Sequence, residues 1–170
     1  TSSPELRVGT YDSGTHKARS FIHFDNINST IAGKYIASAS LILRNFESAN
    51  CSGATIRVGK ITQDWSGSSL TWANQPNVGT LDATFYPAKG GGSDCPAGDA
   101  TWDVTSIVAN WAQDPASNNR GLRIKADDET VNRSWRVYRS ANYSTQDLRP
   151  QLVITYDSIP SAPGQLGATP

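Results

Sequence analysis

Aromatic side chains are the residues of this chain whose types most directly suggest a chemical role. The 170 residues include five tryptophans and six tyrosines but only four phenylalanines, so most of the rings carry a polar edge. Carbohydrate-binding surfaces use such rings, because the ring faces pack on sugar C–H groups while the polar edges stay in water. The rings that we predict for such a role are Trp65, Trp135, Tyr138 and Tyr143.

The same ring types also fill protein cores. For each ring, the neighbouring residues in the sequence indicate whether core packing or sugar binding is favoured. Trp111 lies on the apolar side of a predicted helix, which favours a core position. Trp135 alternates with Val137 along a predicted strand, so a core position competes with sugar binding. Trp65 follows Asp64 and precedes "SGSS", a segment typical of an exposed loop, and it fits both roles.

Three consecutive acidic residues suggest a possible metal site. Asp127, Asp128 and Glu129 come directly after the predicted strand "GLRIKA". Carboxylate oxygens on a loop are the ligands that calcium prefers, so a structural calcium ion is the one cofactor that the sequence suggests. The run does not match an EF-hand loop, and a solvated acidic turn is the alternative interpretation.

The sequence offers no convincing set of catalytic residues. Its two histidines, His16 and His23, do not stand near a nucleophile-elbow sequence. None of the fifteen acidic residues lies in the apolar setting that a glycosidase uses to raise the pKa of its acid. We therefore predict that the chain is not an enzyme.

The two cysteines, Cys51 and Cys95, both lie in segments that contain Gly and Ser and are predicted to be loops. The histidines do not supply the spacing of a zinc site, which leaves two free buried thiols or a disulfide. We favour the disulfide, which would close a loop of about 45 residues and stabilise the fold by roughly 4 kcal/mol. A disulfide implies an oxidising, extracellular compartment.

Charge and hydropathy exclude several classes of partner. Fifteen basic and fifteen acidic residues balance, so we expect neither nucleic-acid binding nor a polybasic contact with a membrane. No apolar run approaches the roughly 20 residues of a membrane-spanning helix. The chain begins with "TSSPELRVG", which is not a signal peptide, and contains no methionine, so we expect a piece of a longer protein.

Most of the sequence alternates between apolar and polar residues with a period of two. Turns rich in Gly, Asn and Ser separate these runs, a pattern typical of a β-sandwich or barrel. One segment departs from the pattern and predicts a short helix at about 104–113, capped by Asp103 or Thr105 and ended by Pro115. The predicted strands include residues 35–48, 55–62, 121–127, 134–140 and 151–157.

The composition changes near the end of the chain. Residues 158–170 contain three prolines and little to bury, so we predict an extended linker towards a following domain. Residues 1–157 form the predicted β-domain.

Four segments follow one another in the chain: "KARSFIHFD", "ITQDWSGSSLTWANQP", "WDVTSIVANWAQDPASNNRGLRIKA" and "SWRVYRSANYSTQDLRPQLVITY". In this order they resemble the DNRLRE domain family, secreted bacterial modules related to carbohydrate-binding module family 96 and to the disaggregatase-related repeats. The resemblance spans about residues 5–157. It implies a jelly-roll-like antiparallel β-sandwich without catalytic activity, a Cys51–Cys95 bond, and a place in a larger secreted or cell-surface protein.

The resemblance carries two further expectations. The "TW..QP" pattern recurs in the family, so Trp72 is predicted to be a packing residue whose truncation costs about 3–5 kcal/mol. Family members usually begin with one more strand ahead of "LRVG", so the edge at Leu6–Gly9 is predicted to be open to a partner strand.

Two functional hypotheses result. The first is a non-catalytic extracellular module of a larger bacterial protein that binds a polysaccharide. The alternative is a structural or adhesive spacer with no sugar ligand, and the fold alone does not separate the two.

Overall fold

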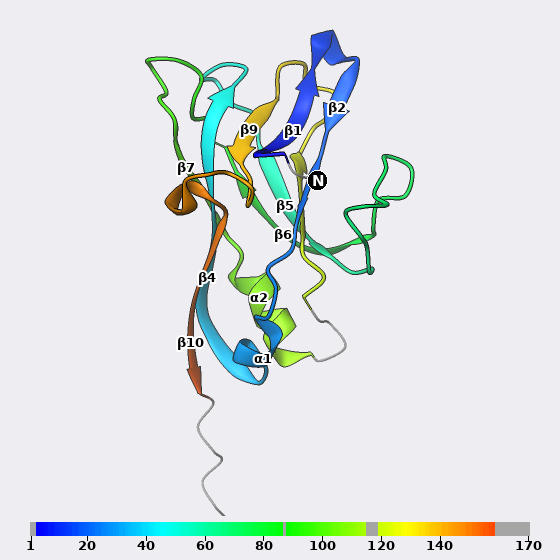
Figure 1. Ribbon diagram of the computed structural model, residues 1–170, viewed down its shortest axis with the longest axis vertical. Coiled ribbons are helices and arrows are strands. Elements are labelled where there is room, and N and C mark those ends of the chain that lie inside the picture. The colour runs from blue at the N-terminus through cyan, green and yellow to red at the C-terminus, as the bar shows by residue number, and fades with distance from the viewer. Residues whose placement is uncertain (1–2, 87, 115–118, 159–170) are drawn as a thin grey trace, which may run out of the picture.

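In the part of the chain that the structure describes, ten strands form two antiparallel sheets that face each other (Figure 1). The computed structural model describes residues 3–86, 88–114 and 119–158. The alternation in the sequence is thus confirmed as a β-sandwich with one helix of more than a single turn. The elements are β1 Glu5–Tyr11, β2 His16–Ala18, β3 Ser20–Ile22, α1 Asn28–Ile31, β4 Lys34–Ser48, β5 Ile56–Ile61, β6 Val78–Phe85, β7 Gly98–Asp103, α2 Thr105–Gln113, β8 Leu122–Ala126, β9 Arg136–Arg139 and β10 Gln151–Ser158.

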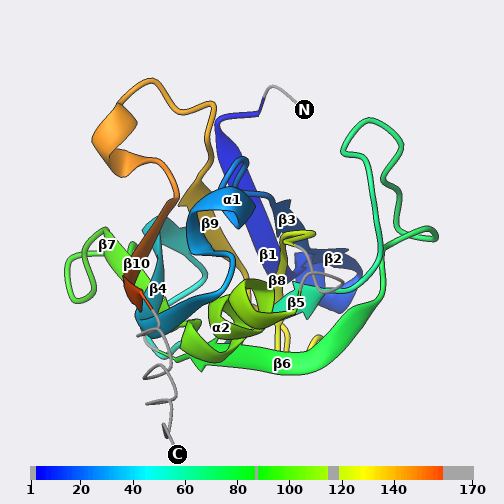
Figure 2. The ribbon, with the colours of Figure 1, turned by 90° about the horizontal axis from the view of Figure 1, so that it is seen from below.

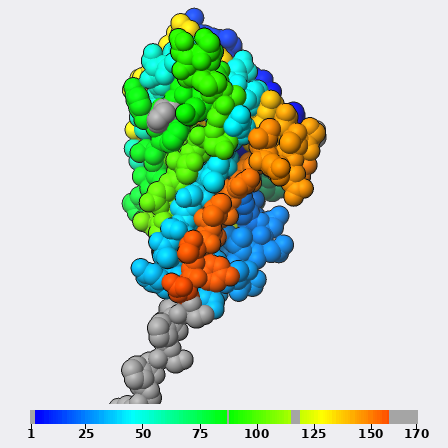
Figure 3. Space-filling view, turned by 90° about the vertical axis from the view of Figure 1, so that its left-hand side faces the viewer, coloured from blue at the N-terminus to red at the C-terminus, as the bar shows by residue number. Residues whose placement is uncertain are grey.

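The two sheets differ in size. One has the order β10-β4-β9-β1-β2, with β7 also paired to β4, and the other has the order β3-β8-β5-β6. The long strand β4 organises the larger sheet, because successive parts of it pair with β10, β7 and β9. Figure 3 shows β10 lying along β4 at the surface of the molecule.

The N-terminal strand β1, whose edge the sequence resemblance predicted to be open, pairs with two other strands in turn. In β1, Glu5–Val8 pair with β9 and Gly9–Tyr11 pair with β2, so each half of the strand has one ladder neighbour. The hydroxyl of Ser20 in β3 also donates to the carbonyl oxygen of Arg7 at 2.8 Å. A partner strand at Leu6–Gly9 stays a prediction.

An aromatic cluster fills the space between the sheets. Trp102 is fully buried, and its ring centroid lies 5.3 Å from Phe85 and 5.8 Å from Tyr138. Its indole N–H donates to the carbonyl oxygen of Ile56 at 3.1 Å, so the polar edge of the ring is satisfied inside the core. Trp111 on α2 is also buried, as its sequence position predicted.

The face of strand β9 that points to the core is the opposite of the one that the sequence pattern predicted. The pattern placed Trp135 and Val137 on the apolar side, but Arg136 and Tyr138 are the residues that point between the sheets, each 1% exposed. Tyr138 packs against Trp102, and Val137 on the other face of the strand is also buried, at 3% exposed, so the reversal leaves neither side chain in water.

Helix α2 confirms the predicted helix at about 104–113. One carboxylate oxygen of Asp103 accepts hydrogen bonds from the backbone N–H of Thr105 at 2.9 Å and from its hydroxyl at 2.6 Å. These bonds lower the pKa of Asp103 below its ordinary value. The backbone N–H of Gly33 donates to Ala112 at 2.8 Å, and α1 and α2 lie together at one end of the sandwich (Figure 2).

The predicted disulfide is confirmed. Cys51 and Cys95 are bonded, with a Cα–Cα distance of 5.6 Å and a sequence separation of 44 residues. The bond joins the β4–β5 loop to the β6–β7 loop.

Two predictions fall on residues that the structure does not describe. These are the helix end at Pro115 and the linker at residues 158–170, of which only residue 158 is described, as the last residue of β10. Within the described part of the chain, no helix has the length and hydropathy needed to cross a membrane.

Candidate functional site

The structure separates the four predicted sugar-binding rings. Tyr138 is 1% exposed, and burial raises the pKa of its hydroxyl, so this ring has no face for a ligand. Tyr143 is half-buried and stacks on the Arg139 guanidinium at 4.0 Å, while Phe46 covers the same guanidinium at 3.5 Å. Tyr143 therefore helps to hold its own loop. Trp65 and Trp135 are half-buried and border surface hollows.

Trp72 is the ring that sequence reasoning misplaced. The packing role implied by the family resemblance is wrong for this chain, because 55% of the Trp72 surface is exposed. The ring borders a hollow of about 320 Å³ together with Thr15, His16 and Lys17. It therefore belongs to the surface beside the β1–β2 hairpin and not to the end of the core.

Local hydrogen bonds hold the turn that carries Trp72. In the β5–β6 loop, residues 62–77, the side-chain oxygen of Asn74 accepts from the backbone N–H of Thr71 at 2.5 Å and from its hydroxyl at 2.9 Å. The Asn74 amide also donates to the carbonyl oxygen of Ser69 at 2.8 Å. The turn closes on itself, so the tryptophan does not need to be buried to fix it.

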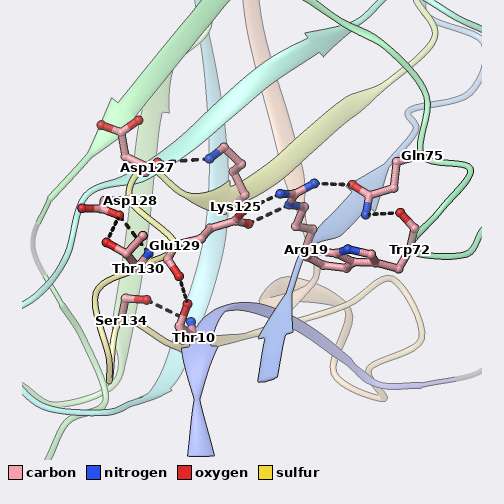
Figure 4. A network of polar contacts seen from close by, with 10 residues as sticks. All are labelled: Thr10, Arg19, Trp72, Gln75, Lys125, Asp127, Asp128, Glu129, Thr130 and Ser134. Carbon is pink, nitrogen blue, oxygen red and sulfur yellow. Dashed lines mark hydrogen bonds and ion pairs between the residues drawn. The ribbon is translucent and has the colours of Figure 1, made fainter. Parts of the chain in front are cut away.

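Arg19 fixes the position of the Trp72 ring. Its guanidinium carbon lies 4.5 Å from the ring centroid, a cation–π arrangement. The same guanidinium donates to Gln75 at 2.8 Å, and the Gln75 amide donates to the carbonyl oxygen of Trp72 at 3.1 Å (Figure 4). One face of the indole is thus covered by Arg19, and the exposed fraction of the ring leaves the other face open to a ligand.

Glu129 in turn anchors Arg19. Its two carboxylate oxygens accept from two nitrogens of the guanidinium, one of them at 2.6 Å, and only 11% of its side chain is exposed. Burial alone would raise the pKa of Glu129, but the hydrogen bonds and charge of Arg19, with the nearby lysines, lower it overall. The hydroxyl of the fully buried Thr10 donates to the backbone carbonyl of Glu129 at 2.8 Å, which ties this loop to β1 (Figure 4).

Trp65 stands on the same loop and packs nearby. Its ring centroid lies 5.6 Å from Phe21, and its indole N–H donates to the carbonyl oxygen of Arg120 at 2.7 Å. The ring forms one wall of a hollow of about 450 Å³. The other residues that line this hollow are His23, Asp64, Gly67, Asn119 and Arg120.

The two tryptophans rest on alternate residues of one extended segment. Arg19 lies under Trp72 and Phe21 under Trp65, while the intervening Ser20 points inwards. Because side chains of an extended strand alternate, the two supporting residues lie about 7 Å apart on one face. The arrangement gives two neighbouring ring positions along the edge of the four-stranded sheet.

Cationic groups flank these rings. Arg123 and Lys125 on β8 share the outward face with Phe21, and Arg123 is directly opposite Phe21 in the β3–β8 pairing. Burial and then the charge of Arg19 lower the pKa of Arg123. Within the described residues, Nε of Arg123 is buried without a hydrogen-bond partner. That nitrogen is not accessible to a ligand, whereas the Lys125 ammonium donates to the carbonyl oxygen of Asp127 at 3.0 Å and has further N–H groups. The site therefore combines apolar ring faces with cationic hydrogen-bond donors, the combination that hydroxyl-rich ligands need.

The acidic run does not converge on a single point. Asp127 pairs with Arg57 at 2.5 Å, Asp128 accepts from the Thr130 backbone at 2.8 Å, and Glu129 pairs with Arg19. Figure 4 shows the three carboxylates pointing in different directions. Within the described residues, no group of three or more His, Cys, Asp or Glu side chains is arranged to hold a metal ion. The predicted calcium site thus has no ligand set here.

Sequence reasoning found Trp65 but missed Trp72 and Arg19 as site residues. One local signal was available, because Thr71 and Asn74 flank Trp72 with the spacing of a self-closing polar turn. No sequence signal linked Arg19 to this loop, since the two segments are more than fifty residues apart.

A comparison with protein families places most of the chain in one family. The family model described as carbohydrate-binding module family 96 matches residues 1–156, which is nearly the whole of the described domain. The curated proteins include no significant match to the chain.

Proposed function

Because the chain belongs to carbohydrate-binding module family 96, we propose that it is a non-catalytic module that binds a polysaccharide through the β5–β6 loop. The sugar rings pack on the open face of Trp72 and against Trp65. The hydroxyl groups of the sugar meet the donors of Arg123 and Lys125 beside these rings. The family match and the β-sandwich support the binding role, and the ring geometry supports this location.

One observation carries the location. Trp72 is the most exposed tryptophan, yet its ring is fixed by Arg19, which Glu129 and Gln75 hold in turn. A rigid exposed ring binds a ligand with little loss of conformational entropy, whereas a mobile ring would lose rotamer freedom on binding. A fixed exposed indole is therefore of direct use to a ligand.

We further propose that the module acts outside the cell, as part of a larger secreted or cell-surface bacterial protein. The Cys51–Cys95 bond supports an oxidising compartment. Polysaccharides of cell walls and matrices are found in the same compartment, so the proposed ligand and the proposed location agree.

The test is retention of the protein on a panel of insoluble and gel-embedded polysaccharides. We expect wild-type protein to be retained on at least one polymer and Trp72→Ala to lose at least tenfold in affinity for it, about 1.4 kcal/mol. Trp72→Phe keeps an aromatic face and should keep most of the affinity.

Tyr35→Ala is the matched control, because Tyr35 is 58% exposed but lies on β4, outside the site. Its retention should equal that of the wild type. If folded wild-type protein is retained on none of the polymers, the spacer function replaces this proposal. If Tyr35→Ala weakens binding and Trp72→Ala does not, the ligand binds elsewhere on the module.

A further inference from the structure

A second hollow lies on the outer face of the six-stranded sheet and shares no lining residue with the hollow beside Trp72, although both adjoin the β1–β2 hairpin. It has a volume of about 260 Å³. Val8 of β1 points into the core, so its neighbour Arg7 points outwards and borders this hollow. The other side chains that argue for a site here are the rings of Trp135 and Tyr11 and the carboxylates of Asp12 and Glu47.

Gly9 allows Trp135 to lie against β1. A Cβ atom at Gly9 would lie 2.6 Å from the carbonyl oxygen of Ser134 and 2.7 Å from Cα of Trp135, distances that no side chain tolerates. Gly9 also has a φ of +93°, which other residues rarely adopt. The missing side chain therefore brings the Trp135 backbone to the strand that carries Tyr11.

The β1–β2 turn fixes the second ring. Tyr11 stacks on His16 with a centroid distance of 5.4 Å and an interplanar angle of 18°. His16 is paired directly with Tyr11 across the hairpin, and its Nδ1 lies 3.1 Å from a carboxylate oxygen of Asp12. Both half-buried rings of the hollow are thus held by backbone or by neighbouring side chains.

The charges around this hollow differ from those around Trp72. Arg7 and Arg136 also border this hollow, but the guanidinium of Arg7 is paired with Glu5 at 2.7 Å and that of Arg136 donates to the carbonyl oxygen of Trp135 at 3.0 Å. Asp12, which His16 also contacts, and Glu47 supply the carboxylates at its border. Carboxylates accept hydrogen bonds from sugar hydroxyl groups and repel the carboxylates of acidic sugars. The hollow beside Trp72 instead has Lys17 at its border, and Arg19 covers one face of the ring.

We propose that the Trp135–Tyr11 hollow is a second saccharide site, selective for neutral sugars, and that the module therefore binds saccharide in two hollows that share no lining residue. This inference rests on the proposed function, because both take the chain to be a saccharide-binding module. The two rings supply apolar faces, and the two carboxylates accept hydrogen bonds from adjacent hydroxyl groups of one sugar.

The experiment follows the indole N–H signals of the tryptophans by two-dimensional ¹H–¹⁵N NMR, with signals assigned from Trp72→Phe and Trp135→Phe. The probes are hexamers of β-1,4-linked glucose, mannose and xylose, and a hexamer of galacturonic acid. We expect at least one neutral hexamer to shift the Trp135 signal and the acidic hexamer to leave it unchanged. Trp72→Ala should not alter the titration of the Trp135 signal.

Glu47→Gln tests the carboxylate while keeping the reporting ring. Glu47 is exposed, so the fold should be retained, and the affinity read from the Trp135 signal should fall about tenfold because a charged acceptor is lost. An unchanged affinity would overturn the assigned role of the carboxylates.

The pattern of shifts separates the two proposals. Shifts of Trp65 or Trp72 alone overturn the second site and leave the proposed function standing. A shift of Trp135 alone supports the hollow and refutes the β5–β6 loop as the binding site. If no hexamer shifts any indole signal, both proposals fail.

Discussion

Two aromatic regions of this molecule use the same residue types for opposite purposes. In the core cluster of Phe85, Trp102 and Tyr138, rings pack on rings, and the Trp102 indole donates to a backbone carbonyl. In the loop pair of Trp65 and Trp72, rings pack on one extended segment and keep part of their surface in water. Enclosure on all sides distinguishes filler from a ligand platform, whereas residue type does not, and neither does a satisfied N–H group, since the Trp65 indole also donates to a backbone carbonyl.

The two regions are also held together by different means. The loops beside the core are joined covalently by Cys51–Cys95, while the β5–β6 loop depends on Arg19, Glu129 and hydrogen bonds within the turn. Covalent closure constrains the unfolded chain and does not require a ring to be buried. A ring held only by a cation on one side keeps its other face free, which suits a binding loop.

Trp102→Ala should have the largest effect on stability. It removes a fully buried indole and leaves a cavity, so the free energy of unfolding should fall by about 3–5 kcal/mol. Urea denaturation followed by circular dichroism gives the value. A loss below about 1 kcal/mol would remove the distinction between filler and platform.

Replacing both cysteines by serine should have the next largest effect. A closed loop with a sequence separation of 44 residues contributes about 4 kcal/mol in the chain-entropy model, and measured losses commonly reach 2–4 kcal/mol. The same urea experiment applies. Polysaccharide retention well below the unfolding temperature should stay at the wild-type level, and a loss of retention would show that the disulfide also positions the binding loop.

Glu129→Gln should lower stability by about 2 kcal/mol at pH 7, because Arg19 loses a charged hydrogen-bond partner. The folded protein lowers the pKa of Glu129, so this contribution is present above the ordinary pKa of about 4.3 and is lost as the pH falls through the folded value. Wild type and variant should therefore converge in acid. A difference that persists unchanged at low pH would contradict an ionic role.

Trp72→Ala should have the smallest effect on stability, at about 0.5–1 kcal/mol, because it removes one exposed cation–π contact. The value contrasts with the 3–5 kcal/mol predicted from the family resemblance. Thermal unfolding of the variant beside Trp102→Ala measures the contrast directly, and a large loss would return Trp72 to the class of packing residues.

Much of the fold could be predicted because it depends on local repetition. The run at 35–48 agrees with β4, the apolar side of Trp111 agrees with α2, and the loop contexts of Cys51 and Cys95 agree with their bond. The candidate site was predicted less well. Of the four proposed rings, Tyr138 is in the core and Tyr143 is stacked on an arginine, while Trp72 was assigned to the wrong class.

The sequence by itself determined the β class, the helix, the family and the disulfide, because each depends on a period, a cap or a motif that neighbouring residues carry. Only the tertiary structure decided which rings meet water and where the acidic residues point. Those outcomes depend on partners distant in the chain, such as Arg19 for both Trp72 and Glu129. A short segment of sequence specifies the type of a side chain. The free energy that orients that side chain comes from contacts with residues that the fold places next to it.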